Sequence, residues 1–174
     1  MRNISLWQLW GFAVTSLGGT LLHFLYDWAG KSLLAAPFSG VNESTWEHMK
    51  LFFFPAFLFA VLQSFFFREQ TDFWCVKLRG TLIGLALIPA LFYTYNGAVG
   101  KSPDWLNVTI FFIAAAIAYL YETRKLQKEG TKCAFPKLAF AALCLLGVSF
   151  VVLTFFSLPL PLFRDPLTGT YGIQ

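Results

Sequence analysis

The sequence predicts an all-α integral membrane protein, a single bundle of five transmembrane helices over residues 1–174. Of these residues, 57% are hydrophobic and only 13% are charged, whereas globular domains carry about 25% charged residues. Runs such as FFFPAFLFAVL and FFIAAAIAYL lack the polar–apolar alternation of membrane β-barrel strands. The composition therefore favours helices that cross a bilayer.

Crossing a bilayer takes roughly 17–25 mostly apolar residues per helix. Five segments approach or reach this length, namely residues 6–26, 51–67, 80–95, 105–121 and 138–156. The first follows Arg2 as a signal peptide would, but it is too long for one, and Pro37 follows the only small-residue site. We therefore expect it to be a retained helix. The second and third are short, and flanking Lys, Arg, Trp and Tyr side chains would extend them to the interface.

Local signals mark several helix ends. Asn42 is expected to cap the second helix, with Glu43 in its first turn. The Ser-Pro-Asp stretch at 102–104 supplies a cap, a first-turn proline and an acid for the fourth helix. Pro136 is expected to open the fifth.

The basic residues predict the orientation. Nine of the 13 Lys and Arg residues fall on the side that holds the N-terminus and the loops 68–79 and 122–137: Arg2, Arg68, Lys77, Arg79, Arg124, Lys125, Lys128, Lys132 and Lys137. By the positive-inside rule, the N-terminus is cytoplasmic and the C-terminus extracytoplasmic in a multi-pass protein of the cell membrane. The formal charge of +4 is thus a topology signal that requires no nucleic-acid partner.

The cysteines suggest no special chemistry. Cys75 and Cys133 fall on the predicted cytoplasmic side, and Cys144 lies within the fifth predicted span. No pair lies outside and no C-x-x-C spacing occurs, so we expect neither a disulfide framework nor a cysteine-based metal site.

Polar residues gather at the outer ends of the first two predicted helices. His23 and Asp27, in HFLYDW, share a helix face at spacing i, i+4. In VNESTWEHMK, residues 41–50, Glu47 and His48 flank Ser44 on one face. Two imidazoles with carboxylates are ligands for Zn, Mn or Fe, and an ionisable group within an apolar span is usually functional. The expected roles are metal ligand for His23, Asp27, Glu47 and His48, and catalytic base for Glu43.

Other polar and aromatic side chains are expected on the same outer side. The C-terminal stretch FRDPLTGTYGIQ contains a turn signal and could fold back over the bundle as a lid, or remain a passive tail. The candidate ligand-binding residues are Asn42, Ser44, Trp46, Tyr93, Tyr95, Asn96, Asp165 and Tyr171.

Three stretches carry a resemblance: VNESTWEHMKLFFFP, the upstream HFLYDW and the closing DPLTGTYGI. Together they resemble a family of small bacterial multi-pass membrane proteins of unknown function, over nearly the whole chain. The resemblance implies a membrane topology and singles out the NES-x-WEH box, and it implies no activity.

Three functions therefore stay open. The first is a metal-dependent hydrolase or transferase acting on a lipid or amphiphile, with a divalent metal as cofactor. The second is a non-catalytic binder of a hydrophobic ligand. The third is a small cation or solute transporter, which the thin polar path through the inner halves of the spans disfavours and which would need a homo-oligomer. Membrane lipids are the expected partners in each case.

Overall fold

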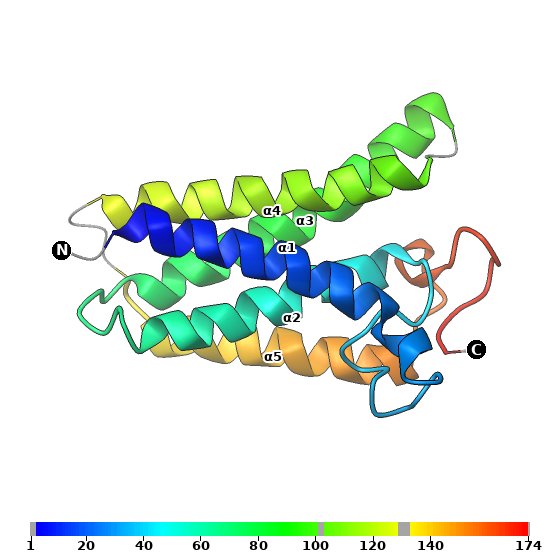
Figure 1. Ribbon diagram of the computed structural model, residues 1–174, viewed down its shortest axis with the longest axis horizontal. Coiled ribbons are helices and arrows are strands. Elements are labelled where there is room, and N and C mark those ends of the chain that lie inside the picture. The colour runs from blue at the N-terminus through cyan, green and yellow to red at the C-terminus, as the bar shows by residue number, and fades with distance from the viewer. Residues whose placement is uncertain (1–2, 101–102, 129–132, 174) are drawn as a thin grey trace.

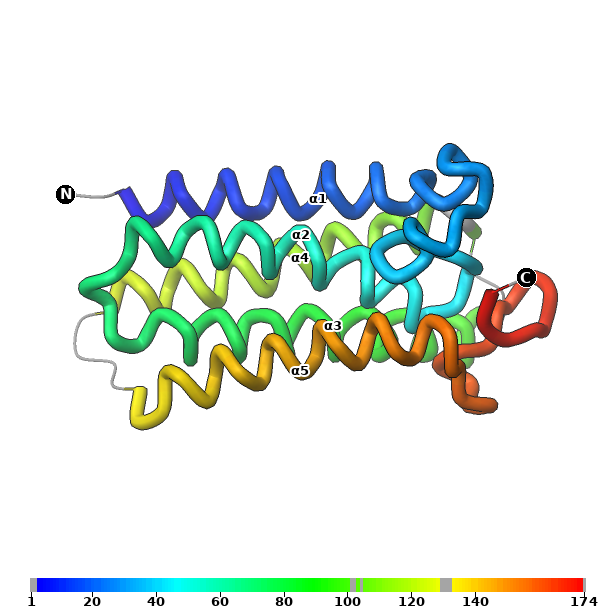
Figure 2. Tube along the Cα trace, turned by 90° about the horizontal axis from the view of Figure 1, so that it is seen from below, coloured from blue at the N-terminus to red at the C-terminus, as the bar shows by residue number. Residues whose placement is uncertain are grey.

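The computed structural model describes residues 3–100, 103–128 and 133–173 and is a bundle of long helices (Figures 1 and 2). The α-helices are α1 (Ile4–Trp28), α2 (Thr45–Ser64), α3 (Phe73–Val99), α4 (Asp104–Gln127) and α5 (Pro136–Phe155), followed by the 3-10 turn η1 (Pro161–Phe163). The predicted all-helical fold with five helices is confirmed, and the described residues form no strand beyond an isolated bridge between Arg164 and Tyr171.

Four of the helices, α1, α3, α4 and α5, are long and apolar enough to cross a membrane. Large apolar side chains also cover the outside of the bundle, where Leu9, Leu17, Leu58 and Leu145 are each more than 60% exposed. Exposing so large an apolar surface to water is energetically unfavourable, whereas contact with lipid chains is not. Length, composition and surface together are those of a membrane protein.

The helix α2 lies at the centre of the bundle and contacts each of the other four. Residues 50–56 of this helix, which include Phe52 and Phe53, are buried on all sides, whereas Leu58 and Leu62 in its second half are exposed. A helix that is apolar all round is a core helix, which explains the phenylalanine-rich stretch. The polar first turns of α2 therefore emerge at one end of the bundle, together with the C-terminal end of α1; we refer to this as the site end, at the right in Figure 1.

Gly19 allows α1 to lie close to its neighbours one turn before His23. A Cβ atom at this position would come within 2.9 Å of the Leu51 carbonyl oxygen on α2 and would overlap the Phe111 ring of α4. Three helices thus meet at Gly19. This contact sets the position of the last turns of α1 relative to the first turns of α2.

The start of α2 differs from the prediction. Ser44, not Asn42, is the N-cap, with its hydroxyl accepting a hydrogen bond from the Glu47 N–H at 3.4 Å. The helix therefore begins at Thr45, and Glu43 lies in the preceding loop rather than in the first turn. The predicted cap at Ser102 lies outside the described residues, while Pro136 does start α5.

The expectation of no disulfide is wrong. Cys75, in the first turn of α3, is bonded to Cys133, which precedes α5. The two helices pack against each other, so these sulfurs meet although 58 residues separate them. The bond lies at the end of the bundle opposite the site end, and Cys144 is the free cysteine of the described chain.

Candidate functional site

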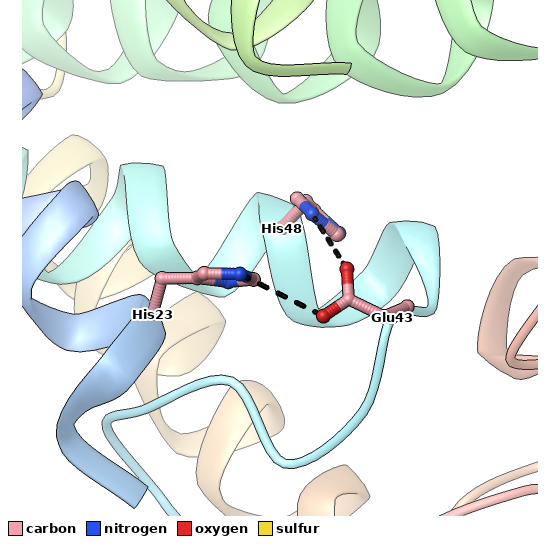
Figure 3. A group of neighbouring side chains, drawn as sticks. All are labelled: His23, Glu43 and His48. Carbon is pink, nitrogen blue, oxygen red and sulfur yellow. Dashed lines mark ion pairs between the residues drawn. The ribbon is translucent and has the colours of Figure 1, made fainter. Parts of the chain in front are cut away.

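His23, Glu43 and His48 converge at the site end (Figure 3). Glu43 lies between the two imidazoles, with one carboxylate oxygen 3.6 Å from His23 Nε2 and the other 3.6 Å from His48 Nε2. The ring centroids are 5.7 Å apart. One ligand atom from each residue lies within 4.8 Å of the other two. Ligands of a tetrahedral zinc ion lie about 3.4 Å apart, so small side-chain rotations would close this triad around one ion.

The orientation of His48 is fixed by its own helix. Its Nδ1 lies 2.9 Å from the Ser44 carbonyl oxygen. A carbonyl oxygen only accepts hydrogen bonds, so Nδ1 carries a proton, and Nε2 is the ring nitrogen that faces Glu43 and His23. Metal-binding histidines commonly have this second hydrogen bond, which selects the tautomer and holds the ring.

The acid predicted to accompany the histidines has another role in the structure. Glu47 is buried and pairs with Lys50, which is fully buried. Its Oε2 also accepts the Val41 N–H at 3.1 Å. Lys50 donates to the Ala36 carbonyl at 2.9 Å and to the Thr154 hydroxyl at 3.0 Å. This pair joins the loop that carries Glu43 to α2 and α5.

The C-terminal residues return to the same loop. Asn42 donates to the Gly172 carbonyl at 2.9 Å, and its side-chain oxygen accepts the Ser44 N–H. Asp165 is buried and accepts from the Leu167 and Thr168 N–H groups, which forms the turn expected at this position. The tail therefore folds over the site end, as both views show (Figures 1 and 2).

The remaining sequence-predicted residues lie outside the triad. Asp27 is exposed on the last turn of α1. Trp46 packs between Phe150 and Phe163, with ring centroids 4.5 and 4.7 Å away. Tyr93, Tyr95 and Tyr171 are exposed or half-exposed, and Asn96 lines a cavity beside the triad.

Two cavities reach the triad from different sides. The first cavity has apolar walls, which include Pro166 and Leu167 of the tail, and polar groups at Glu43, Thr45, Asn96 and Asn107. The second cavity lies between α1 and α4 and is mostly apolar. Both are small, with about 60 and 110 Å³ of space for water-sized molecules, and both are open to the surroundings. The residues that line both are His48, Asn107 and Phe111.

Sequence reasoning missed a second buried polar group nearer the other end. Lys77 and Glu122, assigned above to inner loops, lie within α3 and α4 and form a buried ion pair at 2.6 Å. Lys77 also donates to Gln8 of α1 at 3.3 Å. One signal was available: small residues follow Lys77 at i+3 and i+7, Gly80 and Gly84, and mark a packed helix face.

Comparison with known proteins gives one family match. A family model described as a family of unknown function matches residues 1–173. No curated protein and no solved structure matches the chain significantly.

Proposed function

Because the chain belongs to that family of unknown function, DUF6512, no activity can be transferred from relatives, and we propose a function from the site alone. The proposal is a metal-dependent hydrolase or transferase that acts on a lipid or amphiphile at the membrane surface. His23, Glu43 and His48 are its metal ligands. Glu43 is therefore the carboxylate ligand, in place of Glu47 or Asp27, and is no longer assigned as the catalytic base.

The observation that carries the proposal is the convergence of two imidazoles on one carboxylate, with His48 Nδ1 bonded to the Ser44 carbonyl and Nε2 facing the carboxylate. Two histidines and one carboxylate leave coordination positions open, as in catalytic zinc sites and non-haem iron sites. A divalent cation held there would lower the pKa of a coordinated water and supply a nucleophile near neutral pH. Hydrolysis would form a bond from that water oxygen to the acyl or phosphoryl centre, break the bond to the leaving oxygen and transfer a water proton to the leaving oxygen.

Metal analysis tests the ligand set. Protein purified in detergent, stripped with a chelator and dialysed against Zn²⁺, Mn²⁺ or Fe²⁺ should retain one ion per chain of at least one of these metals. His23→Ala, Glu43→Ala and His48→Ala should each lower affinity by more than the about 10- to 100-fold typical of an outer-shell partner. Asp27→Ala is the matched control, because Asp27 is exposed and one turn from His23 but outside the triad. Retention of the ion by His48→Ala, or its loss in Asp27→Ala, would refute this ligand set.

Turnover separates the enzyme from the alternative, a binder of hydrophobic ligands. The metal-loaded protein should cleave an ester- or phosphoester-bearing amphiphile, and the His48→Ala protein should not. Binding of the amphiphile without cleavage under all metal conditions would favour the binder.

For the orientation, we infer a cytoplasmic N-terminus and an extracytoplasmic site end in the cell membrane. The charge distribution supports this orientation, whereas a disulfide at the opposite end is more usual in an oxidising compartment. A C-terminal alkaline phosphatase fusion should therefore be active and a C-terminal fluorescent protein fusion dark. The reverse pattern would place the basic end and the disulfide outside.

A further inference from the structure

The two cavities differ in polarity and meet at the triad. The first cavity, between α2, α3, α4 and the tail, offers two asparagines, a threonine and Glu43. The second cavity is lined by α1 and α4 side chains that are mainly apolar, among them Phe24, Val108 and Phe112. The first cavity also has apolar walls, but it holds most of the polar side chains, so the polar end of a ligand that reaches both cavities finds its partners there.

The second cavity is bordered by the outer, lipid-facing surface. Phe24, Val108 and Phe112 on its rim are 44%, 55% and 37% exposed. Both helices that carry these residues are long and apolar enough to cross a membrane. They pack together along the bundle and diverge toward the site end (Figure 1). In a bilayer that both helices cross, this rim would face lipid rather than bulk water.

We propose that the site takes a single-chain amphiphile directly from the bilayer, through the second cavity between α1 and α4. Its acyl chain lies along Thr20, Phe24 and Phe112, and its polar group enters the first cavity past His48. The bond next to the polar group then lies at the triad. The reaction at the triad rests on the proposed function, whereas the path by which the amphiphile binds does not require a bound metal.

Photolabelling in the metal-free protein tests the path. The probe is a saturated C16 chain with a mid-chain diazirine and a phosphocholine headgroup, in vesicles of otherwise unlabelled phosphatidylcholine, with a chelator present. Labelling should concentrate on the α1 and α4 segments that line the second cavity. Excess unlabelled single-chain lipid should suppress this labelling, because the cavity is a saturable site.

A pair of α1 variants isolates the cavity. Thr20→Phe places a ring in its mouth, whereas Leu17→Phe adds one on the same helix at an exposed residue that does not line it. In Thr20→Phe, labelling should fall about tenfold, because the new ring would displace about two methylene groups of the lipid chain from the cavity. In Leu17→Phe, labelling should stay unchanged. Metal retention, measured as above, should stay the same in both.

The outcomes distinguish this inference from the proposed function. Saturable labelling that Thr20→Phe removes would support the path even if no metal binds, in which case the chain would be a binder. Non-saturable labelling spread over all lipid-facing helices, equal in the two variants, would overturn the path even if the triad binds metal. Labelling confined to the first cavity would overturn it as well, since the chain would then enter beneath the tail.

Discussion

Lys77→Met is expected to lower the free energy of unfolding by about 3–5 kcal/mol, the cost of removing one partner from a buried ion pair. Lys77 and Glu122 are 2% and 5% exposed, and their charged atoms are 2.6 Å apart. Without the ammonium group, the Glu122 carboxylate has no cation to compensate it between α3 and α4. Its carboxyl group occupies the space that a side chain at Gly80 would fill, so the packing of α3 against α4 holds it at this position.

The double variant Lys77→Met/Glu122→Leu should recover most of this loss, because apolar side chains of similar volume replace a buried pair at little cost. Arg124→Met is the control, since Arg124 lies on α4, the helix of Glu122, but is exposed, and surface changes usually stay within about 0.5 kcal/mol. Reversible unfolding in detergent micelles measures all three. Equal stability of Lys77→Met and Arg124→Met would show that the pair contributes nothing.

The fold class could be predicted because it depends on composition and on the length of apolar runs, which a sequence displays directly. The helix ends were less accessible. Asn42 and Ser44 are both good N-caps, and only the three-dimensional contacts decide between them: Asn42 bonds to Gly172, 130 residues away, and Ser44 is left to cap α2.

The location of the candidate site was accessible from the sequence for a similar reason. The only two histidines of the chain lie at neighbouring ends of consecutive antiparallel helices, and the structure brings them together. The choice among the carboxylates was not accessible. The predicted geometry treated Glu43 as helical, whereas the loop conformation before Ser44 turns it toward both rings.

The buried lysines show that the position of a charged residue near the end of a predicted span does not decide whether its side chain is exposed. Lys50 and Lys77 stand close to span ends in the sequence, where long side chains usually reach the interface. Each instead points inward to a glutamate, Glu47 at i−3 or Glu122 on another helix. The pairing of Lys77 depends on how α3 packs against α4, which no local pattern specifies.

Glu47→Leu is expected to have the second large effect, on stability and on metal binding at once. Lys50 would lose its carboxylate while remaining fully buried, which should lower the free energy of unfolding by about 3–5 kcal/mol. The Val41 N–H would lose its acceptor, so the loop that carries Glu43 would be held less firmly. A supporting residue of this kind alters metal affinity by about 10- to 100-fold.

Glu47→Gln separates support from ligation. A glutamine keeps an oxygen that can accept from Val41 and Lys50 but removes the charge, so metal affinity should fall less than in Glu47→Leu. Metal titration of folded protein, verified by its unfolding transition in the same detergent, compares both variants with His48→Ala. If Glu47 positions the loop, both retain a measurable site and His48→Ala does not. If Glu47→Gln instead loses the ion as completely as His48→Ala, Glu47 is itself a ligand. The metal would then be bound by Glu47 rather than by Glu43, the carboxylate that lies between the histidines in this structure.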